Sequence, residues 1–203
     1  MQNSIQIGQS APNFIAIGVY KQKLGKIRLS DYRGKKYVIL IFYPANFTNI
    51  CFNELTAFND SIDEFQKLSA QLLAISTDNP FSHLHSLLLT RKNGGLENLK
   101  YPLVSDLAQI ISKDYKLLSD DGIVLPGLFI IDKDGIIQYY TVNNLLCSRS
   151  VNEILRILKS IQYIKDNPGR ICPIDLDYFQ NSFYSNPLKS KLFRNNIYSI
   201  EKS

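Results

Sequence analysis

Cys51 is the residue of this chain whose surroundings best suit nucleophilic chemistry. It follows an apolar segment that ends at Pro44, and Asn46 and Thr48 stand where their side chains could cap a following helix. In the first turn of that helix, unsatisfied backbone N–H groups and the helix dipole would stabilise a thiolate. A thiol with an ordinary pKa of about 8.5 could then be ionised at neutral pH. Cys51 is therefore a candidate nucleophile, and a buried structural cysteine is the alternative that this pattern leaves open.

The other cysteines and the two histidines give weaker signals. Three cysteines spread from Cys51 to Cys172 do not form the disulfide framework of a secreted domain, so we expect a reducing compartment. Cys147 should pack or be partly exposed, and we assign it no function. His83 and His85 are separated by one residue and lie far in sequence from any cysteine, a spacing that does not suggest a zinc site. We expect both histidines at solvated helix positions, and we expect no metal and no cofactor.

The composition is typical of one globular domain with a tail. The 203 residues are 45% hydrophobic and 20% charged, and we expect a domain of residues 1–165 followed by an arm of residues 166–203. The net charge of +5 comes from scattered basic residues, which excludes a nucleic-acid footprint. The longest apolar run, Val38 to Tyr43, is too short to cross a bilayer, and no targeting segment is legible. We therefore expect a soluble protein that binds neither nucleic acid nor membrane.

Two apolar segments and one helical pattern predict a parallel strand–helix–strand unit. The segment 36–44 is apolar and β-branched, which is typical of a strand buried on both faces, and its final proline stops the strand. Apolar residues then recur at helical spacing over residues 53–67, and residues 71–77 form a second apolar run. A strand, a helix and a strand in this order favour a βαβ unit.

The second half of the chain predicts a hairpin and a final helix. Residues 127–131 and 136–142 flank a turn in which Asp134-Gly135 supplies the positive φ of a tight hairpin. A helix with one apolar stripe should begin at Val151 and fade near Asp166. The pattern indicates an α/β protein with a mixed central sheet flanked by helices, as in the thioredoxin-like fold, and an extended C-terminal arm.

Several ordered segments give the chain a specific resemblance to a known family. Residues 42–54 closely resemble the peroxidatic-cysteine motif of peroxiredoxins, Pro-x-x-x-Thr-x-x-Cys followed three residues later by Glu. Ile171-Cys172-Pro173 is similar to the resolving-cysteine motif of the typical 2-Cys subgroup, and the likeness extends to plastid-encoded algal members. The resemblance covers about residues 6 to 173, and the further matching segments are 8–14, 29–34, 94–96, 101–106, 127–132, 142–143 and 149–151.

The resemblance implies a two-cysteine peroxidase cycle. Cys51 would attack a peroxide and become a sulfenic acid, while Thr48 hydrogen-bonds the thiolate and peroxide and Pro44 shields the pocket. Cys172 of the partner subunit would then form an intersubunit disulfide with Cys51, and thioredoxin or a similar dithiol would reduce it. Homodimers are implied, and rings of five dimers, or decamers, are common in the family.

The family pattern contains two arginine positions, and this chain keeps only one of them. The resemblance pairs Arg149 with Glu54 of the cysteine motif. A second family arginine normally helps to hold the thiolate and orient the peroxide, but Pro126 stands at its position here. A proline offers no charge-assisted donor and lacks its own N–H, so we predict slower peroxide reduction and a less acidic Cys51 than in relatives.

These residues lead to three hypotheses about the function of the protein. A working peroxidase is favoured by the two cysteines with their motifs, and a peroxiredoxin scaffold with weak or lost activity, acting as an oligomeric holdase or structural protein, is favoured by Pro126. A thioredoxin-like disulfide reductase is disfavoured because the chain has no Cys-x-x-Cys pair. The lack of a transit peptide, the Ile, Lys and Asn bias and the algal resemblance predict the plastid stroma, with the cytoplasm as alternative.

Overall fold

The structure is a computed structural model that describes residues 4–172, and for residues 49–51 it describes the backbone alone. The described chain divides into two compact units, one ending at Asn152 and the other beginning at Glu153. The arm predicted for residues 166–203 lies almost entirely outside the described residues. The predicted boundary after residue 165 therefore stays a prediction.

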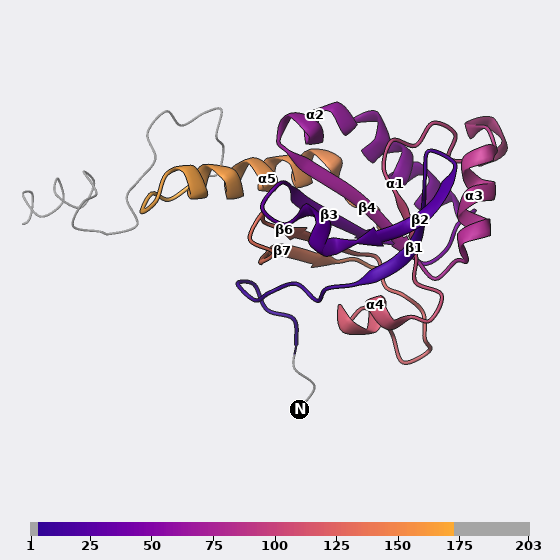
Figure 1. Cartoon of the computed structure of the whole chain (residues 1–203), viewed down its shortest axis with the longest axis horizontal. Helices are drawn as coiled ribbons and strands as arrows, with labels where there is room; N and C mark the ends of the chain where they lie inside the picture. Colours follow the sequence, from indigo (N-terminus) through magenta and orange to yellow (C-terminus); the bar gives the residue numbers. More distant parts are fainter. Residues whose placement is uncertain (1–3, 173–203) are drawn as a thin grey trace, which may run out of the picture. The chain divides into compact units, whose positions relative to one another are not determined.

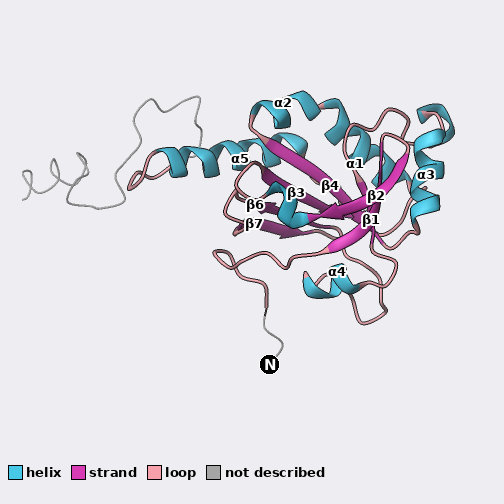
Figure 2. Cartoon of the chain, in the orientation of Figure 1, coloured by secondary structure: helices cyan, strands magenta, loops and turns pink. Residues whose placement is uncertain are grey.

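The first unit is built on a mixed sheet (Figures 1 and 2). Its strands lie in the order β2-β1-β5-β4-β3-β6-β7. The pairs β3–β4 and β4–β5 are parallel, and the other neighbours are antiparallel. The strands are β1 (Ile15–Tyr20), β2 (Lys23–Arg28), β3 (Tyr37–Phe42), β4 (Ala70–Ser76), β5 (Leu103–Ser105), β6 (Gly127–Ile131) and β7 (Ile137–Val142).

Strand β3 is the buried strand that the sequence predicts. All six of its residues are buried, and it lies between β4 and β6, so both of its edges are hydrogen-bonded. The predicted hairpin is also present, because β6 and β7 pair in antiparallel fashion and Gly135 in their turn has φ 84°. The predicted βαβ unit is confirmed by the parallel pairing of β3 with β4.

The helices are α1 (Asn49–Asp60), α2 (Ile62–Lys67), α3 (Pro80–Leu88), α4 (Ile110–Asp114) and α5 (Val151–Asp166), with short 3-10 turns at Leu29–Tyr32 and Arg91–Asn93. The helical segment predicted over residues 53–67 is confirmed, but it is not one continuous helix, because Ser61 separates α1 from α2 with φ −97° and ψ 12°. The apolar spacing continues across Ser61, which is why the pattern does not reveal the break. The final helix is confirmed over its predicted range.

Helix α3 begins where local chemistry places it. Asn79 is the N-cap, and its side-chain oxygen accepts a hydrogen bond from the Ser82 N–H at 2.9 Å. Pro80 occupies the first helical position, where no N–H is needed. This start fixes which residues of α3 are buried, and these are His83, Ser86 and Leu87.

An aromatic group lies at the centre of the core of the first unit. The centroids of the Phe42 and Tyr115 rings are 5.2 Å apart, and those of the Tyr115 and Phe129 rings are 4.9 Å apart.

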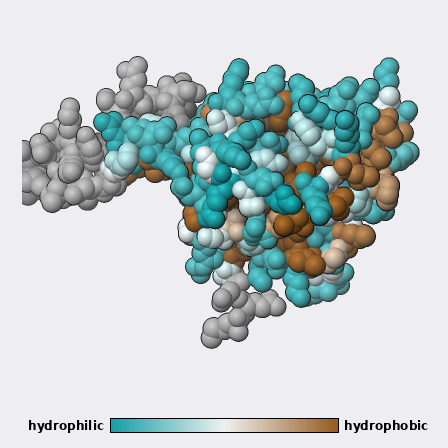
Figure 3. Space-filling model, in the orientation of Figure 1, coloured by the Kyte–Doolittle hydropathy of each residue, from teal (hydrophilic) through white to brown (hydrophobic). Residues whose placement is uncertain are grey.

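On the face shown in Figure 3, most of the surface is hydrophilic, with hydrophobic areas over β1, α3 and α4. No helix within residues 4–172 has the length and apolar character needed to cross a bilayer.

Candidate active site

The end of β3 and the start of α1 position Cys51. The strand ends at Phe42, a loop of residues 43–48 follows, and Thr48 is the N-cap residue with φ −94° and ψ 138°. Cys51 is the third residue of α1, and the Phe52 N–H makes a hydrogen bond of 2.9 Å to the Thr48 carbonyl. The cysteine is therefore in the first helical turn, as the sequence predicts. Backbone N–H groups in this turn have no partner within the helix and favour an anion.

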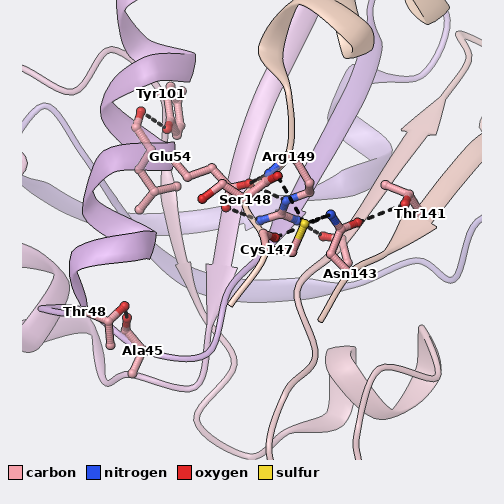
Figure 4. A network of polar contacts seen from close by, with 11 residues as sticks. Ala45, Thr48, Glu54, Tyr101, Thr141, Asn143, Cys147, Ser148 and Arg149 are labelled. Carbon is pink, nitrogen blue, oxygen red and sulfur yellow. Dashed lines mark hydrogen bonds and ion pairs between the residues drawn. The ribbon is translucent and has the colours of Figure 1, made fainter. Parts of the chain in front are cut away.

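The side chains predicted to cap α1 bond elsewhere. Thr48 stands at the N-cap position, but its hydroxyl donates to the Ala45 carbonyl at 3.4 Å and makes no capping bond (Figure 4). Asn46 is buried and bonds to a polar cluster beside the loop. The prediction that these two side chains cap the helix is therefore wrong. Both instead stabilise the loop itself.

A buried ion pair joins α1 to the segment before α5. The Arg149 Nε donates to Glu54 Oε1 at 2.6 Å, and Nη2 lies 2.5 Å from Oε2 (Figure 4). The backbone N–H of Arg149 also donates to Oε1 at 2.8 Å, and Nη1 donates to the Gly127 carbonyl at 2.5 Å. Both side chains are almost fully buried, at 2% and 4% exposure. The structure thus contains the Glu54–Arg149 pair that the resemblance implies, and it fixes α1 one turn beyond Cys51.

A buried tyrosine supports the same turn of α1. The Tyr101 hydroxyl donates to the Leu55 carbonyl at 2.7 Å. Burial raises the pKa of Tyr101 well above its ordinary value, with neighbouring Tyr43 and Glu54 adding to the effect. The phenol therefore stays neutral and keeps its donor hydrogen.

Pro126 leaves the site without a second guanidinium at that position. The residue is buried, and its carbonyl accepts a hydrogen bond of 2.9 Å from the Asn143 N–H. Arg149 does not replace the missing donor, because its three side-chain nitrogens bind Glu54 and the Gly127 carbonyl. The position next to β6 therefore contributes packing and a backbone acceptor.

The remaining two cysteines lie in different surroundings. Cys147 is exposed, as predicted, and the Asn143 side chain lies 3.7 Å from its sulfur. Cys172 is partly exposed and is the last described residue. It belongs to the second unit, and the Pro173 of its motif lies outside the described residues. Its pairing with Cys51 therefore stays a prediction.

Sequence reasoning missed a buried histidine next to the Cys51 loop. His85 is exposed as predicted, but His83 has no exposed surface, so the prediction of a solvated His83 is wrong. The buried face of α3 carries His83, Ser86 and Leu87, which follow the i, i+3, i+4 spacing. His83 and Ser86 are polar, so the buried face of α3 does not show an apolar pattern in the sequence. The spacing of four residues from His83 to Leu87 is the feature from which the burial of His83 could have been predicted. Among the described side chains, no group of three His, Cys, Asp or Glu gathers to hold a metal ion.

The sheet order and the cysteine-bearing helix that follows the central strand define a thioredoxin-like protein. The chain belongs to the AhpC/TSA family, whose sequence model matches residues 7–140, and it is an oxidoreductase of the 2-Cys peroxiredoxin class.

Relatives and solved structures agree on this class over nearly the whole chain. The chain is 64% identical over 203 residues to a putative peroxiredoxin ycf42 of Trieres chinensis, with 100% of both chains covered. It is 50% identical over 190 residues to a chloroplastic 2-cysteine peroxiredoxin of Chattonella marina var. antiqua, covering 94% of this chain and 97% of the relative. The crystal structure of reduced Plasmodium vivax 2-Cys peroxiredoxin superposes with a TM-score of 0.85 at 38% identity, over 90% of this chain and 94% of that one.

Proposed function

We propose that the chain reduces hydrogen peroxide and organic hydroperoxides with Cys51 as the attacking thiolate. The observation that carries the proposal is the place of Cys51, which is the third residue of α1 at the carboxyl end of the central strand. The thiolate sulfur would attack the terminal oxygen and break the O–O bond. The departing oxygen takes up a proton and leaves as water or alcohol, and Cys51 is left as a sulfenic acid.

The second step uses Cys172 of the partner subunit. Its thiolate would attack the Cys51 sulfenic acid, release water after proton uptake, and form an intersubunit disulfide. Thioredoxin or a similar dithiol would reduce that disulfide and return both thiols. This step requires at least a homodimer, and a decamer is the larger assembly that we propose. The solved relatives are 2-Cys peroxiredoxins, which supports a two-cysteine cycle.

The surrounding residues have distinct proposed roles. Thr48 hydrogen-bonds the thiolate and the peroxide, which requires its hydroxyl to exchange the long 3.4 Å bond to Ala45 for the substrate. Pro44 is partly buried at the end of β3 and shields the pocket. Glu54 and Arg149 fix the orientation of α1, the helix that carries Cys51. This support explains why a charged pair is kept in a buried position.

Pro126 supports a second candidate function. Without a guanidinium at this position the transition-state oxygens lose one charge-assisted donor, so slower peroxide reduction and a less acidic Cys51 are expected than in relatives. If turnover is lost altogether, the chain would be an oligomeric holdase or structural protein on the same scaffold.

Relatives named chloroplastic support the plastid stroma as the location, with the cytoplasm as the alternative.

Thioredoxin-coupled peroxide consumption tests the proposal. The wild type should turn over, Cys51→Ser and Cys172→Ser should not, and Cys147→Ser should match the wild type because this exposed thiol has no role in the cycle. Pro126→Arg should raise the rate constant for peroxide by about 100-fold, which is the order that one preorganised donor to the transition state contributes. A folded wild type without turnover would favour the holdase or structural role.

A further inference from the structure

A polar cluster with a buried centre lies beside the loop that leads to Cys51. We name it the Asn46 cluster, and it consists of Tyr43, Asn46, Asp78, Ser82 and His83. Tyr43 and Asn46 belong to the loop that begins after β3, Asp78 lies between β4 and α3, and the last two residues lie on α3. Tyr43 and His83 have no exposed surface, and Asn46 is 8% exposed. The cluster is therefore a polar contact between the loop and α3 inside the first unit.

Asn46 forms hydrogen bonds with all four other members of the cluster. Its side-chain oxygen accepts the Tyr43 hydroxyl at 2.9 Å, and its side-chain nitrogen lies 3.1 Å from both Ser82 Oγ and His83 Nδ1. Its backbone N–H donates to Asp78 Oδ2 at 2.7 Å. Each polar group of this side chain therefore has a partner, and the partners come from both sides of the cluster. A buried amide satisfied in this way holds one orientation strongly.

His83 takes part in the cluster as a neutral ring. Its Nδ1 faces an amide donor and must accept, so we assign the ring proton to Nε2. Burial lowers the pKa of His83 below its ordinary value, and the Asp78 carboxylate and the Val104 carbonyl of β5 oppose the shift. The Tyr43 hydroxyl, 3.5 Å from Nδ1, faces the ring from the loop. No described residue gives the buried Nε2 a hydrogen bond of good geometry.

The loop that the cluster holds contains a strained residue. Phe47 lies directly after Asn46 and has φ 62°, in the left-handed region that a bulky residue rarely adopts. Such a conformation is unfavourable for a bulky side chain and persists only when its surroundings fix it. Thr77 adds a further contact, because its hydroxyl donates to the Pro44 carbonyl at 3.3 Å. The next residue after Phe47 is the N-cap of the Cys51 helix.

We infer that His83 is a positioning residue for peroxide reduction: through its Nδ1 and the Asn46 amide it holds residues 43–48 in the conformation that sets Cys51 against its substrate. His83 does not touch the reacting atoms in this scheme, and it acts through Asn46. The inference rests on the proposed role of Cys51. Loss of the Nδ1 acceptor would leave an Asn46 donor buried and unpaired, and the strained loop would relax.

The test compares three variants of the full chain. His83→Leu removes the acceptor, and His83→Asn keeps an oxygen near the position of Nδ1. Leu87→Ala is the matched control, because it destabilises the same buried face of α3 and removes no hydrogen bond of the cluster. The readout is the loss of the Cys51 thiol after mixing the reduced protein with hydrogen peroxide, followed by alkylation and peptide mapping. Iodoacetamide alkylation of Cys51 as a function of pH gives a second readout that needs no peroxidase activity.

His83→Leu should lower the rate constant for peroxide by about tenfold or more, since misplacing a reacting group by about 1 Å can cost about 100-fold. It should also raise the midpoint pH of Cys51 alkylation. His83→Asn should restore most of the rate and the midpoint, and Leu87→Ala should leave both near those of the wild type while it lowers Tm. If His83→Leu does not fold, Asn46→Ala removes the same hydrogen bond from the loop side and should give the same result.

The inference is overturned if folded His83→Leu reacts like the wild type, if Leu87→Ala slows the reaction equally, or if His83→Asn rescues nothing. These results differ from failure of the proposed function. In that case the wild type itself would not react with peroxide, and the alkylation profiles would still report whether His83 controls the environment of Cys51.

Discussion

Replacing Arg149 with methionine removes the cation of the buried pair while keeping a long apolar side chain. Glu54 then remains 4% exposed with a charge and two oxygens that had accepted from the guanidinium. The Gly127 carbonyl also loses its donor. The backbone N–H of residue 149 can still donate to Glu54 Oε1, which limits the loss.

The expected size of this effect follows from the burial. Breaking a buried ion pair by removing one partner costs about 3 to 5 kcal/mol, because the remaining charge is uncompensated. Glu54→Gln should cost less than Arg149→Met, since the amide oxygen still accepts one guanidinium bond. Once one partner has been replaced, replacing the other should cost less unfolding free energy than it does in the wild type. The coupling energy between Glu54 and Arg149 should therefore be about 1 to 3 kcal/mol.

Urea unfolding of the wild type, Arg149→Met, Glu54→Gln and the double variant measures these energies. All four proteins must be compared at one protomer concentration, because an oligomer unfolds with a concentration-dependent midpoint. Arg156→Met is a control, since its pair with Glu153 is about half exposed and should contribute less than about 1 kcal/mol. A cost below about 1 kcal/mol for Arg149→Met, or a coupling energy near zero, would mean that the buried pair does not stabilise the fold.

Two further predictions concern stability. Because burial lowers the pKa of His83, the unfolded chain binds this proton more readily, so stability should fall as the pH drops from about 6.5 towards the lowered folded value, and His83→Asn should remove that part of the slope in urea unfolding. An equal slope in both proteins would contradict this. Gly95→Ala should destabilise by about 1 to 3 kcal/mol, because its Cβ would meet the Leu89 carbonyl, whereas Gly25→Ala has open space. Thermal unfolding should show a lower Tm for Gly95→Ala alone, and equal shifts would refute the overlap.

The parts of the fold with strong local signals could be predicted from the sequence. The apolar segment 36–44 gave a strand buried on both faces, and Asp134-Gly135 gave the hairpin between β6 and β7. The β1–β2 hairpin was not predicted. Its strand β2 is mostly exposed and carries Lys23, Gly25 and Lys26, so no clean alternation of apolar and polar residues marks it.

The candidate site could be predicted only where a motif or a strong residue preference pointed to it. The place of Cys51 followed from its position after β3, and the Glu54–Arg149 pair followed from the resemblance. The Asn46 cluster could not be predicted, because its members are polar residues from three separate segments that meet only in the fold. Sequence alone gives a polar residue on a helix an exposed position by default, and His83 is an exception whose Nδ1 has Asn46 as a buried partner.

The two-cysteine cycle is tested most directly by mapping the disulfides after the reduced protein has received one equivalent of hydrogen peroxide. We predict one dominant linked pair of peptides, containing Cys51 and Cys172, which appears as a dimer on non-reducing gels and is absent in Cys51→Ser. A linkage of Cys51 to Cys147, or a fully reduced Cys51 after peroxide has been added, would show that Cys51 and Cys172 do not carry the peroxidase cycle.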